Sequence, residues 1–301
     1  MKLNSFLSLS AGLAALLVTA GTAHAQTAYG VNAAGSLFSF NLATPGSITT
    51  LGNLGFTPEA IDFRPGTSTL YAVDVNSTTG VGNLYTVNTS TGAATVIGSG
   101  FSAATLIGAT SIAFDFNPTT LQGDTTIRIR FVASNGSNFR LNSGTATIAN
   151  TDGTISGVAN ASVTGAAYTN SNVAVAPGGG STALYYIDSF NNTLLVSSDP
   201  NAGTVAAIGP LGFDIGTDVG FDIVTGGSVN TAYIVNSSTT SSLYTVDLAT
   251  GATTFVGNIA SNFAGGFAID QLSAIPEPST YAAILGAVGI TLAASRRRQR
   301  A

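Results

Sequence analysis

The sequence predicts an all-β protein, a five-bladed β-propeller, from three observations. A short apolar unit recurs about every 50 residues, a period typical of repeat architectures. Each period holds further short runs rich in β-branched and aromatic residues, separated by Gly, Asn, Asp or Ser, as strands and tight turns are. Between residues 26 and 274 no segment keeps a helical spacing of apolar residues over three turns. Four strands per period indicate a propeller blade.

The first strand of each blade is assigned to the recurring apolar unit. Its third position is occupied by Asp62, Asp115, Thr169, Asp222 and Asp270. The carboxylates could form a ring that chelates calcium, which prefers oxygen ligands. They could instead accept hydrogen bonds from backbone N–H groups, because a buried carboxylate needs such partners. Since Thr replaces Asp in one copy, the hydrogen-bonding interpretation is favoured.

The remaining strands follow the apolar unit in order. A second unit, with the pattern Leu-Tyr-x-x-Asp or a close variant, occupies residues 70–74, 184–188 and 232–236. A third unit pairs two strands about a turn, at residues 84–98 and again at 243–257. Each of these hairpins carries a Thr-Gly pair, and glycine tolerates the positive φ that a tight turn requires.

The two ends of the repeat region complement each other. Residues 29–52 match the second, third and fourth strands of a blade, whereas residues 265–271 match only the first strand. Together they make one blade, and joining them closes the ring and hides its sheet edges. The prediction is therefore a propeller over residues 26–274, with a six-bladed ring or a β-sandwich as alternatives.

The N-terminus has the features of a secretory signal peptide over residues 1–25. Lys2 supplies the positive start, an apolar run follows from residue 6 to residue 18, and Ala23-His24-Ala25 gives the small-x-small pattern of a cleavage site. An uncleaved anchor is the alternative, but the run is shorter than the roughly 20 residues that span a bilayer. Cleavage would leave Gln26 as the first residue and would remove the single histidine of the chain.

The C-terminus, residues 275–301, combines three features in order. They are a Pro-Glu-Pro triplet, an apolar stretch at residues 281–294 and a basic tail, which together comprise Pro276, Glu277, Pro278, Arg296, Arg297, Arg298 and Arg300. The arrangement resembles the PEP-CTERM sorting signal of Gram-negative bacteria, with a short transmembrane helix. The resemblance implies an exosortase-type protease as a partner and transient anchoring in the inner membrane. Release at the cell surface or outside the cell would follow. A plain single-span anchor is the alternative.

The segment from residue 114 to residue 142 carries a second resemblance. It reads Phe-Asp-Phe-Asn-Pro at 114–118, Ile-Arg-Ile-Arg-Phe-Val-Ala-Ser-Asn-Gly at 127–136 and Asn-Phe-Arg-Leu-Asn at 138–142. These residues resemble the bacterial family called domain of unknown function 4394. The likeness extends over most of residues 28–272, although the connection at residues 121–126 is longer than usual. The resemblance implies no activity.

Composition excludes several classes of function. The chain of 301 residues has a net charge of -5, and its repeat region holds four arginines against thirteen acidic residues. A nucleic-acid partner is not expected, because such proteins need a basic surface. The chain has no cysteine and would lose its only histidine with the signal peptide. Thiolate nucleophiles, histidine bases and zinc or haem sites are therefore not expected, and neither a metal nor another cofactor is predicted.

Three of the four arginines of the repeat region lie close together in the sequence. Arg128 and Arg130 are two residues apart on a predicted strand and so face the same side, and Arg140 lies on the next strand. The cluster is a candidate anionic-ligand site, since guanidinium groups bind carboxylate or sulfate in a bidentate manner. Alternatively the arginines pair with Asp115, Asp124 or other acids of the repeats, which so acidic a domain favours.

The sequence thus predicts a secreted surface or extracellular-matrix protein, built as a binding or structural propeller and not as an enzyme. Exopolysaccharide or other surface proteins are the expected partners. The alternative is a polysaccharide hydrolase or lyase that uses carboxylates, although no spacing singles out a catalytic pair.

Overall fold

The computed structural model describes residues 26–118, 128–171, 182–226, 229–237 and 240–271. The predicted signal peptide, the sorting signal with its Pro-Glu-Pro triplet and arginine tail, and the connection at residues 121–126 lie outside the described residues. Within the described ranges, no helix has the length and apolar character needed to cross a membrane.

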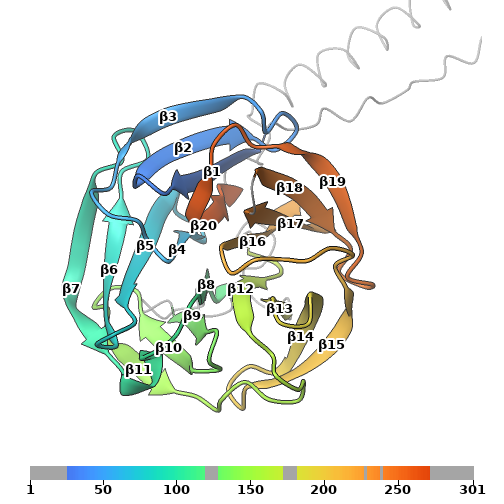
Figure 1. Ribbon diagram of the computed structural model, residues 1–301. Helices are drawn as coiled ribbons and strands as arrows, with labels where there is room; N and C mark the ends of the chain where they lie inside the picture. The colour runs from blue at the N-terminus through green and yellow to red at the C-terminus, as the bar shows by residue number, and fades with distance from the viewer. Residues whose placement is uncertain (1–25, 119–127, 172–181, 227–228, 238–239, 272–301) are drawn as a thin grey trace, which may run out of the picture.

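Twenty strands form five four-stranded antiparallel sheets in the described residues, arranged as blades around a central axis (Figure 1). Blade 1 comprises β20 (Phe263–Ile269), β1 (Thr27–Asn32), β2 (Ser36–Asn41) and β3 (Ile48–Asn53). Blade 2 comprises β4 (Ala60–Arg64), β5 (Thr69–Asn76), β6 (Val81–Val87) and β7 (Ala94–Ser102), followed by the short 3-10 helix η1 (Ala104–Leu106). The five-bladed propeller is thereby confirmed.

The other three blades repeat the same order from the axis outward. Blade 3 comprises β8 (Ile112–Phe116), β9 (Arg128–Ala133), β10 (Asn138–Asn142) and β11 (Ile148–Thr151). Blade 4 comprises β12 (Val163–Tyr168), β13 (Leu184–Asp188), β14 (Thr193–Asp199) and β15 (Thr204–Pro210). Blade 5 comprises β16 (Val219–Gly226), β17 (Val229–Ser237), β18 (Ser241–Val246) and β19 (Thr253–Asn258).

The ring closes in blade 1, where the last strand of the chain pairs with the first. β20 lies antiparallel to β1, with Ala28 opposite Ile269 and Gly30 opposite Phe267 (Figure 1). This pairing confirms the closure that the two incomplete ends of the repeat predict. It protects an inner sheet edge that would otherwise be open to pairing with another chain.

Small residues let the innermost strands approach one another around the axis. A Cβ atom added to Gly220 in β16 would lie 2.2 Å from the Cβ of Phe267 in β20. A Cβ atom on Gly266 in β20 would lie 2.2 Å from the backbone nitrogen of Ile61 in β4, and Gly266 has a φ of 82°. Both distances are far below van der Waals contact, so five blades fit around the axis only because these positions lack a side chain.

Two glycines in outer strands let these strands approach the hairpin turns of neighbouring blades closely. A Cβ atom on Gly52 in β3 would lie 1.8 Å from the carbonyl oxygen of Thr91, in the hairpin turn of blade 2. Gly209 in β15 meets the carbonyl of Thr250, in the hairpin turn of blade 5, in the same way at 2.1 Å. The Thr-Gly turns of the sequence repeat therefore act between blades as well as within one hairpin.

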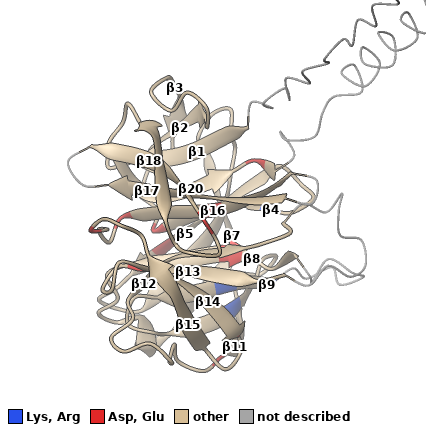
Figure 2. Cartoon of the chain, turned by 90° about the vertical axis from the view of Figure 1, so that its right-hand side faces the viewer, with Lys and Arg blue, Asp and Glu red and all other residues tan. Residues whose placement is uncertain are grey.

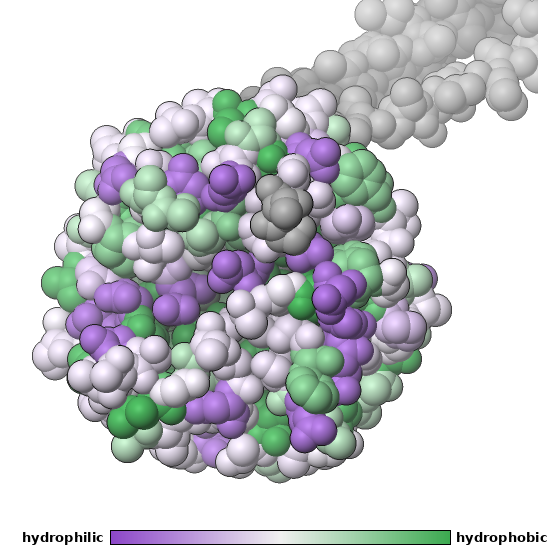
Figure 3. Space-filling view, in the orientation of Figure 1, coloured by the Kyte–Doolittle hydropathy of each residue, from purple (hydrophilic) through white to green (hydrophobic). Residues whose placement is uncertain are grey.

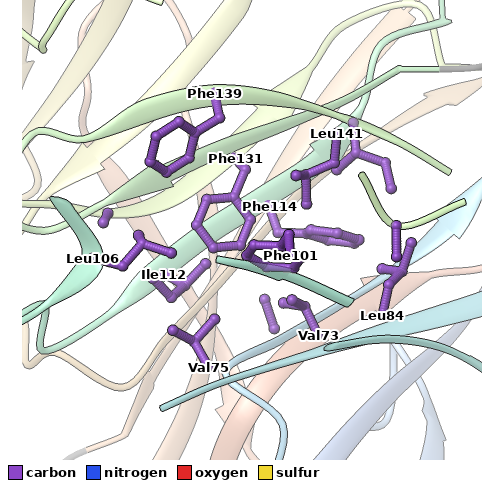
Figure 4. Close-up of a cluster of buried hydrophobic side chains, with 14 of the residues drawn as sticks. Val73, Val75, Leu84, Phe101, Leu106, Ile112, Phe114, Phe131, Phe139 and Leu141 are labelled. Atoms are coloured by element: carbon purple, nitrogen blue, oxygen red, sulfur yellow. The ribbon is translucent and has the colours of Figure 1, made fainter. Parts of the chain in front are cut away.

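Hydrophobic cores fill the spaces between adjacent blades. The largest cluster joins blades 2 and 3, and Figure 4 shows its aromatic and aliphatic side chains packed together. Phe101 of β7 and Phe131 of β9 meet edge to face, with ring centroids 5.5 Å apart. Leu106 of η1 is fully buried in the same cluster. Blade-to-blade packing of this kind contributes most of the stability of a repeat architecture.

Strand pairing defines the equivalent positions of the five inner strands. Asp62 of β4 lies opposite Tyr71, and Asp222 of β16 lies opposite Tyr233 in the same relation. Asp115 occupies this position in β8, where it faces Arg130. These three aspartates therefore stand at one level of the ring.

In the other two blades the sequence repeat placed the equivalent position two residues too far along the chain. The pairing with the second strand assigns it to Ala167 in β12 and to Ala268 in β20. Thr169 and Asp270 lie beyond the ends of these strands. The carboxyl ring thus has three members, and alanines occupy its other two places.

Candidate functional site

The five innermost strands surround the propeller axis and enclose a space that we call the channel (Figure 1). Near it the three aspartates join neighbouring blades through backbone hydrogen bonds. Asp62 Oδ1 accepts from the N–H of Phe63 at 2.7 Å, and Oδ2 accepts from the N–H of Phe116 in blade 3 at 3.0 Å. Asp115 accepts in turn from the N–H of Tyr168 in blade 4. The inner edge of each innermost strand has N–H groups without a partner strand, and these carboxyls satisfy them.

The third aspartate repeats this geometry across the closure of the ring. Asp222 Oδ1 accepts from the N–H of Ile223 at 2.6 Å, and Oδ2 accepts from the N–H of Ile269 in blade 1 at 2.7 Å. Gln271 adds a further link, since its side chain accepts from the N–H of Thr225 and donates to the carbonyl of Ile223. The hydrogen-bonding interpretation of the repeated aspartates is confirmed for these positions.

Burial and mutual repulsion favour the protonated form of these carboxyls. Burial raises the pKa of Asp62 to about 6, although hydrogen bonds from Asp115 and from backbone N–H groups oppose the shift. Burial, the charge of Asp62 and a hydrogen bond to Asp62 raise the pKa of Asp115 well above its usual range. Burial and the charge of Asp62 do the same for the pKa of Asp222. A proton on Asp115 allows it to donate to Asp62, which keeps both carboxyls paired.

The structure does not support the calcium interpretation of the ring. In the described parts of the chain, no three acidic side chains are grouped so that they could hold a metal ion. The oxygens of Asp62 and Asp222 are already occupied by backbone N–H groups. The carboxyls of the ring therefore link neighbouring blades through hydrogen bonds.

A polar cavity of about 200 Å³ opens at one end of the channel. It is lined by the segments that lead into β4, β8 and β16 and by residues of β20. Its polar side chains are Thr57, Glu59, Thr110, Ser111, Thr217 and Asp218. We call these residues the channel mouth. Because segments from different blades share one cavity, the innermost strands of blades 2, 3 and 5 all start at this end.

A narrow section, lined mostly by apolar residues, lies between the channel mouth and the carboxyl ring. It encloses a cavity of about 20 Å³, walled by Ile61, Phe114, Phe221 and Phe267 among others. Val219 and Gly266 line both cavities, so the two are adjacent. We call this section the collar.

Like charges meet at the channel mouth. Partial burial raises the pKa of Glu59, and the neighbouring charges of Asp74 and Asp218 raise it further. Glu59 and Asp218 both retain contact with solvent. Among the described residues that line the cavity there is no basic side chain. The sequence carried one signal of this site, since both acids directly precede the first strand of a blade.

Of the predicted arginine cluster, the structure places Arg130 between blades 3 and 4. Arg130 is 2% exposed, and its Nη1 donates to Asp152 Oδ2 at 2.7 Å and to Asn138 Oδ1 at 2.8 Å. Its Nη2 donates to Asn201 Oδ1, in the hairpin turn of blade 4, at 2.9 Å. Its Nε lies 3.5 Å from the hydroxyl of Tyr168. The guanidinium of Arg130 is thus held on all sides by groups of the protein.

Arg140 shares the same carboxylate. It lies opposite Arg130 in the sheet, and its Nε and Nη2 donate to Asp152 at 2.9 and 2.8 Å. Arg128 is half-buried at the start of β9, opposite Asn142. Figure 2 shows a patch of basic residues beside β9, whereas acidic residues appear at several places on the molecule. We call Arg130, Arg140, Asp152, Asn138 and Asn201 the interblade network; sequence reasoning had not singled out Asp152.

The family model for "Domain of unknown function (DUF4394)" matches residues 36–268, and the chain belongs to this family, as the sequence predicted. A comparison with curated proteins finds no match. The chain is similar to a solved candidate 6-phosphogluconolactonase from Bacteroides fragilis, at 13% identity and a TM-score of 0.42, covering 79% of this chain and 82% of that one. It is also similar to a protein of unknown function from Bacteroides caccae, at 9% identity and a TM-score of 0.46, covering 82% and 99%. No activity is transferred from these structures.

Proposed function

We propose that the protein is an exported bacterial surface or matrix component whose propeller binds a glycan at the channel mouth. The order of signals at the two ends of the sequence supports export and later release by an exosortase-type protease. The acidic charge of the repeat region and its lack of lysine support a partner other than nucleic acid.

The observation that carries the binding role is the shape of the channel mouth. A cavity of about 200 Å³ is smaller than the roughly 300–1,000 Å³ of pockets that enclose a drug-sized ligand. It suits a single sugar residue of a longer chain. The collar adjoins the cavity, and Thr57, Thr110 and Thr217 are among the residues that line the cavity. Hydroxyl and carboxylate groups supply the hydrogen bonds that a sugar requires.

A carboxylate-dependent polysaccharide hydrolase or lyase is the second candidate. Glu59 and Asp218 share one cavity, and the pKa of Glu59 is raised, as it is in a general acid of this chemistry. Both side chains, however, remain in contact with solvent. Binding without turnover is therefore the function that the geometry supports better.

A glycan screen of the purified protein tests the binding role. It should include the exopolysaccharide of the producing organism, and the release of new reducing ends should be measured on every glycan that binds. We expect binding without release, and we expect the double change Glu59→Gln and Asp218→Asn to abolish it. Asp214→Asn is the matched control, because Asp214 is also exposed and lies in the same connection but does not line the cavity. Release of reducing ends that Glu59→Gln stops would favour the enzyme instead.

The export and sorting part of the proposal has its own test. In a host with the sorting protease, intact-mass measurement should find a chain that begins near Gln26 and lacks Arg296–Arg300. Replacing Pro276, Glu277 and Pro278 by alanine should leave the basic tail attached. A full-length species in the envelope of such a host would contradict the sorting proposal without affecting the binding proposal.

A further inference from the structure

The channel mouth carries negative charge, and none of the described residues that line it is basic. Glu59 and Asp218 line the cavity, and Asp74 lies close enough to raise the pKa of Glu59. Of the arginines, Arg130 and Arg140 are committed to Asp152 between blades 3 and 4. Held close together without a basic partner, these carboxylates favour a ligand that brings positive charge or strong hydrogen-bond donors.

Hydrogen bonds fix the segments that carry the hydroxyl groups of the channel mouth. Ser111 donates to the carbonyl of Thr217 at 3.1 Å, which joins the entry segments of blades 3 and 5. Thr110 Oγ1 and Ser134 Oγ are 3.0 Å apart, which fixes the same segment of blade 3. The wall of the cavity is therefore built from tied segments, and its polar groups suit a ligand rich in hydroxyl groups.

A second and independent observation comes from the collar directly below. Thr164 is 1% exposed and lines the collar, and its Oγ1 finds no hydrogen-bond partner among the described residues. A buried hydroxyl without a partner is costly, so such a group calls for a partner from outside the chain. The cavity of about 20 Å³ next to it accommodates one small polar group, since about 10–15 Å³ suffices for one water.

We propose that the channel mouth recognises a glycan with free amino groups, through an ammonium on Glu59 and Asp218 and a sugar hydroxyl or its bound water on Thr164. This inference rests on the proposed glycan-binding function and names the class of glycan. An ammonium donates up to three hydrogen bonds and neutralises the paired carboxylates. Calcium fits less well, because it takes six to eight oxygen ligands and only two carboxylates line this cavity.

The test compares two probes that differ only at the nitrogen. Oligosaccharides of glucosamine and of N-acetylglucosamine, of equal length, are titrated into the purified protein by calorimetry at low salt, with and without a chelator. We expect the free amine to bind at least tenfold more tightly, and we expect added salt to weaken it. Equal affinity for the two probes, or binding that disappears with the chelator, would overturn the inference but leave glycan binding intact. Failure to bind any glycan would remove the proposed function as well.

Variants separate the two contacts. Glu59→Gln and Asp218→Asn should each reduce the affinity for the glucosamine probe by at least fivefold and reduce the affinity for the acetylated probe by a smaller factor. Asp214→Asn should change neither. Thr164→Val should weaken both probes equally while the melting temperature of the free protein stays the same or rises, because the orphan hydroxyl is removed. If Asp214→Asn weakens the amine probe as much as Asp218→Asn does, the effect is one of net charge and the site is wrong.

Discussion

The interblade network and the channel mouth are both polar regions where blades meet, yet they differ in how charge is balanced. In the network one carboxylate, Asp152, is shared by two guanidinium groups, and Arg130 is almost wholly buried. At the mouth two carboxylates, Glu59 and Asp218, are exposed and face no basic side chain among the described lining residues. Figure 3 shows hydrophilic residues dispersed among hydrophobic ones over one face of the ring. Charge is thus balanced within the interblade network, whereas the carboxylates of the channel mouth face solvent.

The strongest way to break this comparison is to remove the shared carboxylate. Asp152→Ala leaves Arg130 buried without a counter-ion, and the free energy of unfolding should fall by about 3–5 kcal/mol. Chemical denaturation followed by circular dichroism measures the change. Asp214→Asn, at an exposed carboxylate, should change it by less than about 0.5 kcal/mol. A loss as small for Asp152→Ala would show that Arg130 does not depend on Asp152 for charge compensation.

The fold was accessible from the sequence because each blade repeats the same alternation of strands and turns. Asp62, Asp115 and Asp222 stand where the repeat placed them, and the joining of the two ends in blade 1 was foreseeable from the missing units. The register of β12 and β20 was not, because alanine occupies the aspartate position in both strands. In each case a polar residue lies two places further along the chain, Thr169 or Asp270, and the repeat pattern was therefore aligned on it.

The candidate site was less accessible, since it depends on closure of the ring. Glu59 and Asp218 come from blades 2 and 5, far apart in the sequence, and only the circular arrangement brings them to one cavity. Asp152 lies just after β11, outside any repeated unit, so nothing in the pattern linked it to the arginines. The arginines themselves were found because they cluster locally on adjacent strands.

The carboxyl ring is intermediate between the interblade network and the channel mouth. Its aspartates are buried, but their partners are backbone N–H groups and the proton that two carboxyls share, and not arginines. A pKa raised in the folded state makes the protein more stable where the group is protonated in both states. For Asp62 this stability is fully present below about pH 4 and is lost as the pH rises through about 6, up to about 3 kcal/mol at roughly 1.4 kcal/mol per pKa unit. Unfolding free energies of wild type and Asp62→Asn at several pH values should therefore diverge in this window. Parallel curves would show that Asp62 titrates normally.

Arg140 offers a smaller test within the interblade network. It is 28% exposed, and Asp152 keeps Arg130 as a partner when Arg140 is lost. Arg140→Met should therefore cost about 1 kcal/mol or less, far below the effect of Asp152→Ala. Chemical denaturation of the two variants at low and at high salt measures both losses of unfolding free energy. A cost for Arg140→Met equal to that of Asp152→Ala would mean that Arg140 neutralises the buried carboxylate and Arg130 does not.

The smallest expected effect concerns the channel mouth, where the comparison predicts a change of the opposite sign. Asp218 shares the cavity with Glu59 and no described lining residue is basic, so we expect Asp218→Asn to remove repulsion and no attraction. The free energy of unfolding should stay within about 0.5 kcal/mol of wild type or rise slightly, because both groups are exposed and water screens them. Thermal denaturation at low salt measures the change, and added salt should abolish any gain. A clear loss of stability would show that Asp218 has a structural partner, and the channel mouth would then resemble the interblade network.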